Sequence, residues 1–316
     1  MFGSSPLARF APLALLLIAG FALPQVLPQY FLFLGNILMM YAVLALGLDI
    51  LLGWAGQFAF AHVAFFGIGT YTTALLQARL GVPFVIGMPL GAALAGLIGL
   101  VIGFPATRLR TVYLALATFA FAEAAQWVFN AWDKVTGGPD GLRISAPSVL
   151  GYATGSDPTA FPVMAAILVL MIAATMYLTT SKLGRAMCAV RESEHVAAAS
   201  GIDVNATKVA AFAISAIYAG VAGGMFTLFQ SFVNPDVFSF GQIVLLLSMI
   251  VVGGLGSIPG VLIGVALLGL LPEIMRTTMR AFLVWQEFGY GVILVLVIMF
   301  MPRGIWGMIV ARRGAP

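Results

Sequence analysis

Apolar runs of about 20 residues, repeated along most of the chain, constrain the fold more than any other feature. A helix needs about 20 apolar residues to cross a bilayer core about 30 Å thick. Hydrophobic residues make up 62 % of the 316 residues, and charged residues only 8 %. Spans are predicted near 9–28, 31–52, 57–76, 83–104, 111–132, 161–180, 208–229 and 288–302. We therefore predict an all-α, polytopic transmembrane helical bundle that forms one domain over residues 1–316.

The apolar stretch 241–271 is interrupted by the glycine- and proline-containing sequence 253–260, so it forms either two short helices or one broken helix. Because Lys and Arg are enriched on the cytoplasmic side of membrane proteins, their distribution separates the two arrangements. Two helices place ten of the 15 Lys and Arg residues inside and five outside, whereas one helix gives nine against six. The count favours two helices, about ten helices in all, and both termini in the cytoplasm.

The N-terminal segment, with Arg9 before an apolar run, also has the pattern of a secretory signal peptide. The run is long for a signal peptide, and a second span follows almost at once. We therefore favour a retained first helix.

Small residues recur at every fourth position of the predicted span 83–104: Gly87, Gly91, Ala95, Gly99 and Gly103. Such a face allows a neighbouring helix backbone to approach closely. This pattern, repeated at Gly220 and Gly224, predicts close helix packing.

Glycines interrupt the apolar sequence at two places, 53–57 and 253–260. In transporters, such interruptions mark discontinuous helices beside the pathway, but they also make simple turns between helices. Both interpretations remain open. The candidate pathway residues at these two breaks are Gly56, Gln57, Gly254 and Gly256.

Glu123, His62 and Asp49 are ionisable residues inside predicted spans, and Asp49, close to the cytoplasmic end of its span, can reach interfacial water. A carboxyl group at membrane depth is costly and needs a partner, so Glu123 either lines a pathway or hydrogen-bonds a neighbouring group such as Gln126. A lone imidazole among alanines is more typical of a packing residue than of a ligand. No cluster of His, Cys or carboxylate residues has metal-site spacing, so no metal site is predicted.

The chain shows no sign of enzyme chemistry or of nucleic-acid binding. None of its three lysines follows a glycine, which excludes the phosphate-binding loop of ATPases. No basic cluster is interleaved with aromatic residues, as nucleic-acid binding would require. No cofactor is predicted in this subunit, and membrane lipid is its expected surroundings.

The segment 181–208 holds seven charged residues in 28 positions, the density of a soluble surface, and charge counting places it in the cytoplasm. Ser181 is a suitable helix N-cap and Gly201 a suitable stop, so one amphipathic helix is predicted between them. Its apolar face consists of small residues, namely Ala186, Ala189, Val190, Ser193, Val196 and Ala197. We interpret it as a docking helix, with a solvated linker as the alternative.

The segment 133–160 is hydrophilic and rich in glycine, proline and serine, which predicts an external loop. It is either a plain solvated loop or a docking surface for an external partner.

Four segments in this order resemble the permease subunits of branched-chain amino acid ABC importers, most closely the LivM-type subunit. They are GLDILLGWAGQFAFAHVAFFGIGTY (47–71), TGGPDGL (136–142), GRAMCAVRESEHVAAASG (184–201) with 211–224 after it, and GGLGSIPG (253–260). The resemblance extends over roughly residues 30–303 and implies an inner-membrane protein.

The resemblance also implies partners: a second permease of the LivH type, two cytoplasmic ATPase subunits that use ATP and Mg, and an external substrate-binding protein. It further implies that 181–208 is the segment through which ATP hydrolysis is coupled. The coupling candidates are Arg185, Arg191, Glu192, Glu194, Ala197, Ala198 and Gly201.

The predicted function is therefore translocation of a small solute, delivered by the external protein, by the permease subunit of an importer. Ala59 stands where the family often has serine, and related permeases carry urea, amides or aromatic acids, so the solute stays open. The alternatives are a proton-coupled secondary transporter that uses Glu123 with His62, and a channel-like facilitator that needs no energy source.

Overall fold

A computed structural model of the chain describes residues 6–106, 109, 111–144, 148–149, 152–153, 157–278, 288–289, 291–292, 295–296, 299 and 304–313. The long helices are α1 (Pro6–Ala22), α2 (Gln29–Asp49), α3 (His62–Leu80), α4 (Phe84–Ala106), α5 (Thr111–Ala131), α7 (Asp157–Thr180), α10 (Val204–Phe229), α11 (Phe240–Gly253) and α12 (Ile258–Thr278). Shorter helices are α6 (Asp133–Thr136), α8 (Lys182–Glu192), α9 (Glu194–Ala199) and α14 (Gly304–Arg313).

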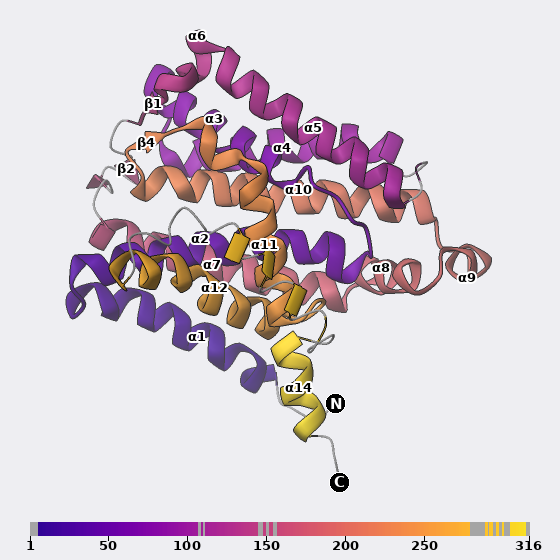
Figure 1. The fold of residues 1–316 in the computed structure, drawn as a ribbon. Helices are drawn as coiled ribbons and strands as arrows, with labels where there is room; N and C mark the ends of the chain where they lie inside the picture. The colour runs from indigo at the N-terminus through magenta and orange to yellow at the C-terminus, as the bar shows by residue number, and fades with distance from the viewer. Residues whose placement is uncertain are drawn as a thin grey trace.

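The long helices lie side by side, with α2, α3, α4, α5, α7 and α10 roughly aligned along one axis (Figure 1). One end of this bundle carries α8 and α9, and the other carries α6 and four short strands. The strands are β1 (Leu142–Arg143), β2 (Ser148–Val149), β3 (Tyr152–Ala153) and β4 (Phe232–Val233). The prediction of an all-α polytopic bundle is confirmed.

Five of the described helices are long and apolar enough to cross a bilayer, and three shorter ones are also apolar. The five are Gln29–Trp54, Phe84–Pro105, Val112–Ala131, Pro158–Thr180 and Val204–Phe229. The region 241–271 contains two helices, α11 and α12, separated at Gly254 to Ser257, as the charge count favours. The predicted span 288–302 lies largely outside the described residues.

The predicted span 57–76 differs from the structure, because α3 begins only at His62. The chain passes from α2 through one π-helical turn, η2 (Ile50–Trp54), and then runs without helix from Ala55 to Ala61. This stretch crosses the front of the bundle between α5 and α11 (Figure 1).

Glycine-lined contacts hold α3, α4 and α10 together. A Cβ atom on Gly220 of α10 would lie 2.6 Å from Cα of Ala92 in α4, and one on Gly69 of α3 would lie 2.5 Å from Cα of Gly220. Such distances leave no room for a side chain. The helix backbones are therefore in direct contact, the arrangement that small residues permit in membranes.

The small-residue face predicted on 83–104 is the face of α4 that packs against the bundle. Ala95 is fully buried. A Cβ atom on Gly99 would meet Ala216 at 2.4 Å, and one on Gly103 would meet Phe212 at 2.9 Å. Gly87 is the exception, since its nearest neighbour would lie 3.7 Å away, an ordinary contact.

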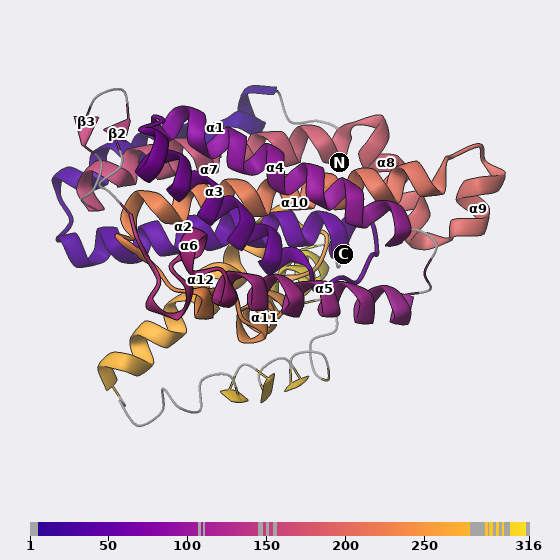
Figure 2. The ribbon, with the colours of Figure 1, turned by 90° about the horizontal axis from the view of Figure 1, so that it is seen from above.

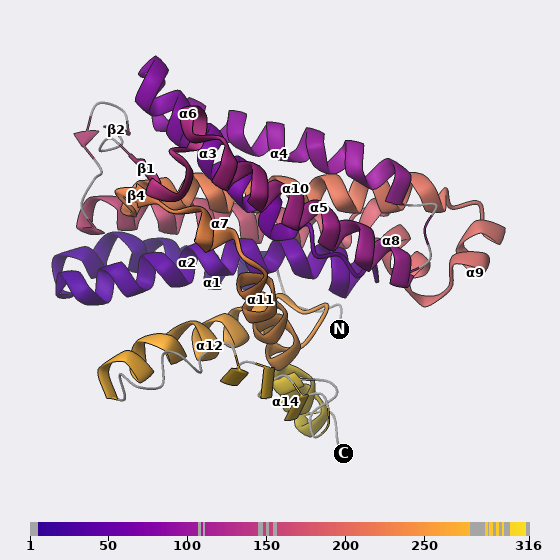
Figure 3. The same ribbon diagram turned by 45° about the horizontal axis from the view of Figure 1, so that its top comes forward.

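Helices α5 and α11 lie on one side of the bundle, opposite α1 and α7 (Figure 2). Helix α11 is steeply inclined to the long helices, and α12 leads away from it (Figure 3). In the most apolar stretch of α5 only 17 % of the residues are buried, against 72 % in α10. Among the five spanning helices, α5 is therefore the least covered by the chain itself.

The end of the bundle opposite α8 is closed by short tertiary links. Strand β1 pairs antiparallel with β4, which joins the segment after α6 to the segment after α10. The 3₁₀ turn η4 (Pro235–Phe238) follows, and Phe238 packs against Tyr71 and Phe129 with ring centroids 5.6 Å from each. The rings tie α3, α5 and η4 together.

We expect Gly220→Ala to destabilise the protein by about 1–3 kcal/mol, because the new methyl group would overlap the backbone of α4. Gly87→Ala is the matched control, since its methyl group has room and alanine favours the helix. Thermal unfolding of the purified protein in detergent measures both. Equal stability of the two variants would contradict the close packing of α10 on α4.

Candidate coupling and translocation site

Hydrogen bonds to η2 and to α5 satisfy three backbone N–H groups in the break between α2 and α3. The N–H of Ala55 donates to the carbonyl oxygen of Ile50 at 3.1 Å, and that of Gln57 donates to Leu51 at 2.9 Å. The N–H of Phe60 donates to Oγ1 of Thr118 on α5 at 3.0 Å. Backbone without helix at membrane depth is tolerated only where it is buried in protein or lines an aqueous cavity. The bonds to Ile50, Leu51 and Thr118 meet this requirement for the three N–H groups.

The second break, between α11 and α12, contains two glycines with positive φ, Gly254 (φ 122°) and Gly256 (φ 72°). These conformations are readily accessible only to glycine. The N–H of Gly256 donates to Oδ1 of Asp49 at 2.8 Å. Asp49 is the last residue of α2, so the two breaks are joined although 207 positions separate the bonded residues.

Asp49 was not among the candidates chosen from the sequence. The residue is 1 % exposed. Its carboxylate accepts a hydrogen bond from the Gly256 N–H, in place of the carbonyl oxygen that would accept it in a helix. The signal for it was present, since Asp49 is the only carboxylate in the apolar run just before the 53–57 glycine sequence. Its position at the end of a span made it resemble an interfacial group.

Arg191 of α8, in the polar segment, also contacts residues of the two breaks. Its guanidinium donates to the carbonyl oxygen of Gly53. A Cβ atom on Gly56 would lie 2.9 Å from its Cγ, and one on Gly256 would lie 3.2 Å from its Nη1. Arg191 therefore contacts both breaks, and we call Asp49, Gly53, Gly56, Arg191 and Gly256 the junction.

The segment 181–201 forms two helices, so the prediction of one continuous helix is wrong. The chain bends at Ser193, whose extended backbone (φ −162°, ψ 116°) ends α8, while its hydroxyl accepts a hydrogen bond from the N–H of Val196 and caps α9. The cap at Ser181 is confirmed, with Oγ accepting from the N–H of Gly184 at 3.2 Å. Gly201 ends the segment with φ 81°.

The bend changes which side chains face the bundle. The buried residues are Gly184, Met187, Val190 and Ala197. Val196 and Ala197, predicted on one small-residue face, differ, since Val196 is 65 % exposed and Ala197 is buried, because that face assumed one unbroken helical phase. Ala198 and Gly201 are exposed, as are Arg185, whose Nη1 donates to the Thr180 carbonyl oxygen at 2.8 Å, and Glu192.

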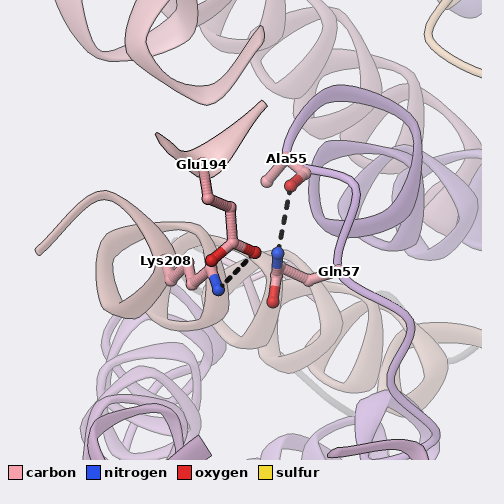
Figure 4. A network of polar contacts seen from close by, with 4 residues as sticks. All are labelled: Ala55, Gln57, Glu194 and Lys208. Carbon is pink, nitrogen blue, oxygen red and sulfur yellow. Dashed lines mark hydrogen bonds and ion pairs between the residues drawn. The ribbon is translucent and has the colours of Figure 1, made fainter. Parts of the chain in front are cut away.

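Glu194 forms an ion pair with Lys208 of α10, at 2.6 Å between Oε1 and Nζ. The Lys208 side chain is only 5 % exposed and the Glu194 side chain 51 %. Gln57 points toward this pair, and its Nε2 donates to the Ala55 carbonyl oxygen at 3.3 Å (Figure 4). The start of α9 is thus fixed to α10, next to the first break. A buried Lys needs such a counter-ion, so breaking the pair would cost stability.

His62 is buried among three helices with both ring nitrogens hydrogen-bonded. Its Nε2 lies 2.8 Å from the carbonyl oxygen of Leu44, and its Nδ1 lies 2.9 Å from Oγ of Ser215. A carbonyl oxygen only accepts, so Nε2 carries the proton and Nδ1 accepts from the serine hydroxyl. This arrangement of a neutral imidazole favours the packing interpretation over proton transfer.

Glu123 lies on the exposed side of α5 and, among the residues that the structure describes, has no hydrogen-bond or ion-pair partner. The expected bond to Gln126 is not formed between described atoms. With Phe60, Ser239 and Phe240 it lines a small cavity of about 10 Å³, roughly the space of one water molecule. The aromatic rings of Phe60, Phe119 and Phe240 are packed on the same side, with centroids 5.2–6.1 Å apart.

A bundle of membrane-spanning helices with two breaks, joined to a polar helical segment at one end, defines a multi-pass membrane transport subunit. The chain belongs to the family described as the permease component of branched-chain amino acid transport systems, whose pattern matches residues 30–301. As a permease component it is a transport subunit of an ABC importer in the inner membrane, without its own ATPase site.

Several curated relatives are similar over most of the chain. The LivM permease of the high-affinity branched-chain amino acid transport system of Escherichia coli (strain K12) is 30 % identical over 94 % of this chain and 74 % of the relative. Its counterpart in Salmonella typhimurium is 31 % identical over 97 % of this chain and 76 % of the relative. The LivH permease of Escherichia coli is 27 % identical over 84 % of this chain and 91 % of the relative. No solved structure matches this chain.

We expect Ser215→Ala to destabilise the protein by about 1–3 kcal/mol, because it leaves Nδ1 of buried His62 without a donor. Ser248→Ala is the matched control, since the buried Ser248 hydroxyl bonds only to the Val244 carbonyl oxygen one turn earlier in its own helix. Thermal unfolding in detergent compares them. A loss for Ser248→Ala as large as that for Ser215→Ala would contradict a specific stabilising role of the bond between Ser215 and His62.

Proposed function

We propose that this chain is the LivM-type permease of an importer for branched-chain amino acids, in which α8 and α9 receive the motion of the ATPase subunits. The observation that carries the proposal is the junction, where a side chain from the polar segment contacts both membrane breaks. The proposed partners are two cytoplasmic ATPases that use ATP and Mg, a second permease of the LivH type and an external binding protein. The LivM and LivH names of the relatives support a permease pair.

The ATPase contact is proposed on the exposed side of α9 and the end of α8. There Val196 and Ala198 present a small apolar patch, flanked by Glu192 and ended by Gly201. Ala197 faces inward and Glu194 is engaged by Lys208, so these two would hold α9 in position while its exposed face meets the ATPase. Arg185, at the start of α8, adds a positive charge to the same end.

The proposed orientation places α8, α9 and both termini in the cytoplasm. Helix α1 is antiparallel to α2, because the short turn η1 (Leu23–Gln25) joins them, so α1 begins at the end of the bundle where α2 ends. A Cβ atom on Gly304, the first residue of α14, would lie 2.6 Å from Cα of Gly254. The start of α14 is thus beside the junction, which supports a cytoplasmic C-terminus.

The second permease is proposed to cover α5 and α11, with the pathway between the two subunits. Glu123 is exposed near the middle of α5, and a carboxylate facing lipid at that depth is strongly unfavourable. Phe240, 45 % exposed, lies next to it. The break residues Gly56 and Gln57 are on the chain segment that crosses this side. Gly254 and Gly256 would act by shaping the break between α11 and α12.

The external binding protein is proposed to dock at the opposite end, on the 133–160 loop. Its described part is ordered by glycines: Gly137, Gly138 and Gly141 all have positive φ, and β1 holds the loop against β4. Arg143 and Phe232 are exposed on this pair of strands. Branched-chain amino acids are the proposed solute because the relatives' names specify them; urea, amides and aromatic acids are the alternatives to be tested by binding to the external protein.

We expect Val196→Asp to weaken co-purification of the ATPase subunits by at least about tenfold, because a charge replaces an apolar contact at the proposed interface. Val196→Leu is the matched control and should retain the ATPases. Tandem affinity purification of the co-expressed complex measures the ratio of subunits. Normal ATPase recovery with Val196→Asp would contradict docking on α9.

The energy source separates the importer from a proton-coupled transporter. We expect uptake by cells to persist when a protonophore collapses the proton gradient at constant ATP, and to stop when the ATPase partner carries an inactivating substitution. Glu123→Gln, which keeps the size of the side chain, should leave this pattern unchanged. Uptake that is lost with the protonophore, and lost equally in Glu123→Gln, would support the proton-coupled alternative instead. Uptake that survives both treatments would support the facilitator.

A further inference from the structure

We propose that Asp49 and Arg191 are positioning residues that transmit the movement of α8 to the two membrane breaks. The inference rests on the proposed function, in which α8 and α9 contact the ATPase. It goes further by naming the two side chains through which the movement reaches the membrane, one of them outside the family-like segment 184–201.

Covalent connection alone does not explain how α8 would act on the breaks. Helix α8 follows α7 and precedes α10, whereas the first break follows α2 and the second follows α11. Arg191 supplies the missing contact, because its guanidinium donates to the Gly53 carbonyl oxygen at the first break. Asp49 then relates the first break to the second, through its bond to the N–H of Gly256.

The groups around Gly53 are closely packed. A Cβ atom on Gly53 would lie 2.1 Å from Oδ1 of Asp49 and 2.6 Å from the nitrogen of Gly256. The stem of Arg191 is in contact with Gly56. Arg191 itself is partly open to solvent, but Gly53, Asp49 and Gly256 leave no room between them, so a displacement of Gly53 by Arg191 is expected to move all three, since packed interiors shift between discrete arrangements.

The chemistry of the pair also favours a two-state element. Asp49 is 1 % exposed and accepts a hydrogen bond from the Gly256 N–H, while Arg191 donates to the carbonyl oxygen of buried Gly53 next to it. If α8 withdraws Arg191, the carbonyl oxygen of buried Gly53 loses its partner. Unpaired buried groups are costly, so the breaks are expected to rearrange until this oxygen is satisfied again.

The test uses cysteine alkylation at two places in the complete complex with its ATPases. Cys188 on α8 is the only native cysteine and is half-buried; the second reporter is Ser257→Cys at the second break, in a Cys188→Ser background. Because burial raises the pKa of the Cys188 thiol, labelling is done at alkaline pH where the thiolate forms. Rates are compared between the nucleotide-free and the ATP-trapped complex.

We expect both reporters to change rate on ATP trapping in the otherwise native complex. In Arg191→Met and in Asp49→Asn, Cys188 should still respond, while the response at position 257 is lost and transport falls by about tenfold or more. Arg191→Lys keeps the charge but not the planar guanidinium, so it should recover part of the position 257 response and part of the transport. It also provides a test if the Arg191→Met complex fails to assemble. Lys182→Met, at an exposed position of the same helix, is the control.

A position 257 response that persists unchanged in Arg191→Met and Asp49→Asn, with normal transport, would overturn this inference and leave the proposed function intact. No response of either reporter in the native complex would overturn the contact of α8 and α9 with the ATPase, and this inference with it.

Discussion

Backbone hydrogen bonding in the membrane is the constraint on which the rest of this structure depends. A helix that stops inside a bilayer leaves N–H and C=O groups that water cannot satisfy, so another part of the protein must supply partners. Here the partners are few and identifiable. Asp49 accepts from Gly256, Thr118 accepts from Phe60, and Arg191 donates to Gly53. One of these partners, Arg191, comes from the polar segment outside the bundle, so α8 is in direct contact with the first break.

The tightly packed helices provide the fixed frame for this arrangement. Where glycines bring α3, α4 and α10 into backbone contact, movement of one helix against another would produce overlap or an empty space. The breaks are different, since their polar contacts can be exchanged. We therefore expect movement to concentrate at 50–61 and 254–257, next to the sparsely covered α5. The exposed Glu123 on that helix is consistent with a surface that another protein subunit covers.

Much of the fold could be predicted from the sequence, because length and apolar composition determine where a helix crosses a bilayer. The separation of α11 from α12, the packing face of α4 and the cap at Ser181 followed from spacing and residue type. The start of α3 and the bend at Ser193 did not. The glycines of 53–57 mark a break, but its extent to Ala61 depends on contacts with other elements, such as Thr118 of α5, which accepts the Phe60 N–H. Ser193 interrupts a pattern that otherwise predicts one helix.

The junction could not be predicted as a unit, since the bond between Asp49 and Gly256 spans 207 positions and local patterns carry no information about it. The coupling and pathway roles of individual residues remain predictions.

Hydrogen exchange of backbone amides tests the central claim most directly, that the polar segment and both breaks move as one unit. It is measured by mass spectrometry on the complete complex, with and without trapped ATP, on peptides that cover 50–61, 182–199 and 253–258. If the junction transmits movement, exchange changes in all three segments together, including the Gly256 amide that Asp49 holds. A change confined to 182–199, with both breaks exchanging at the same rate in the two states, would contradict it.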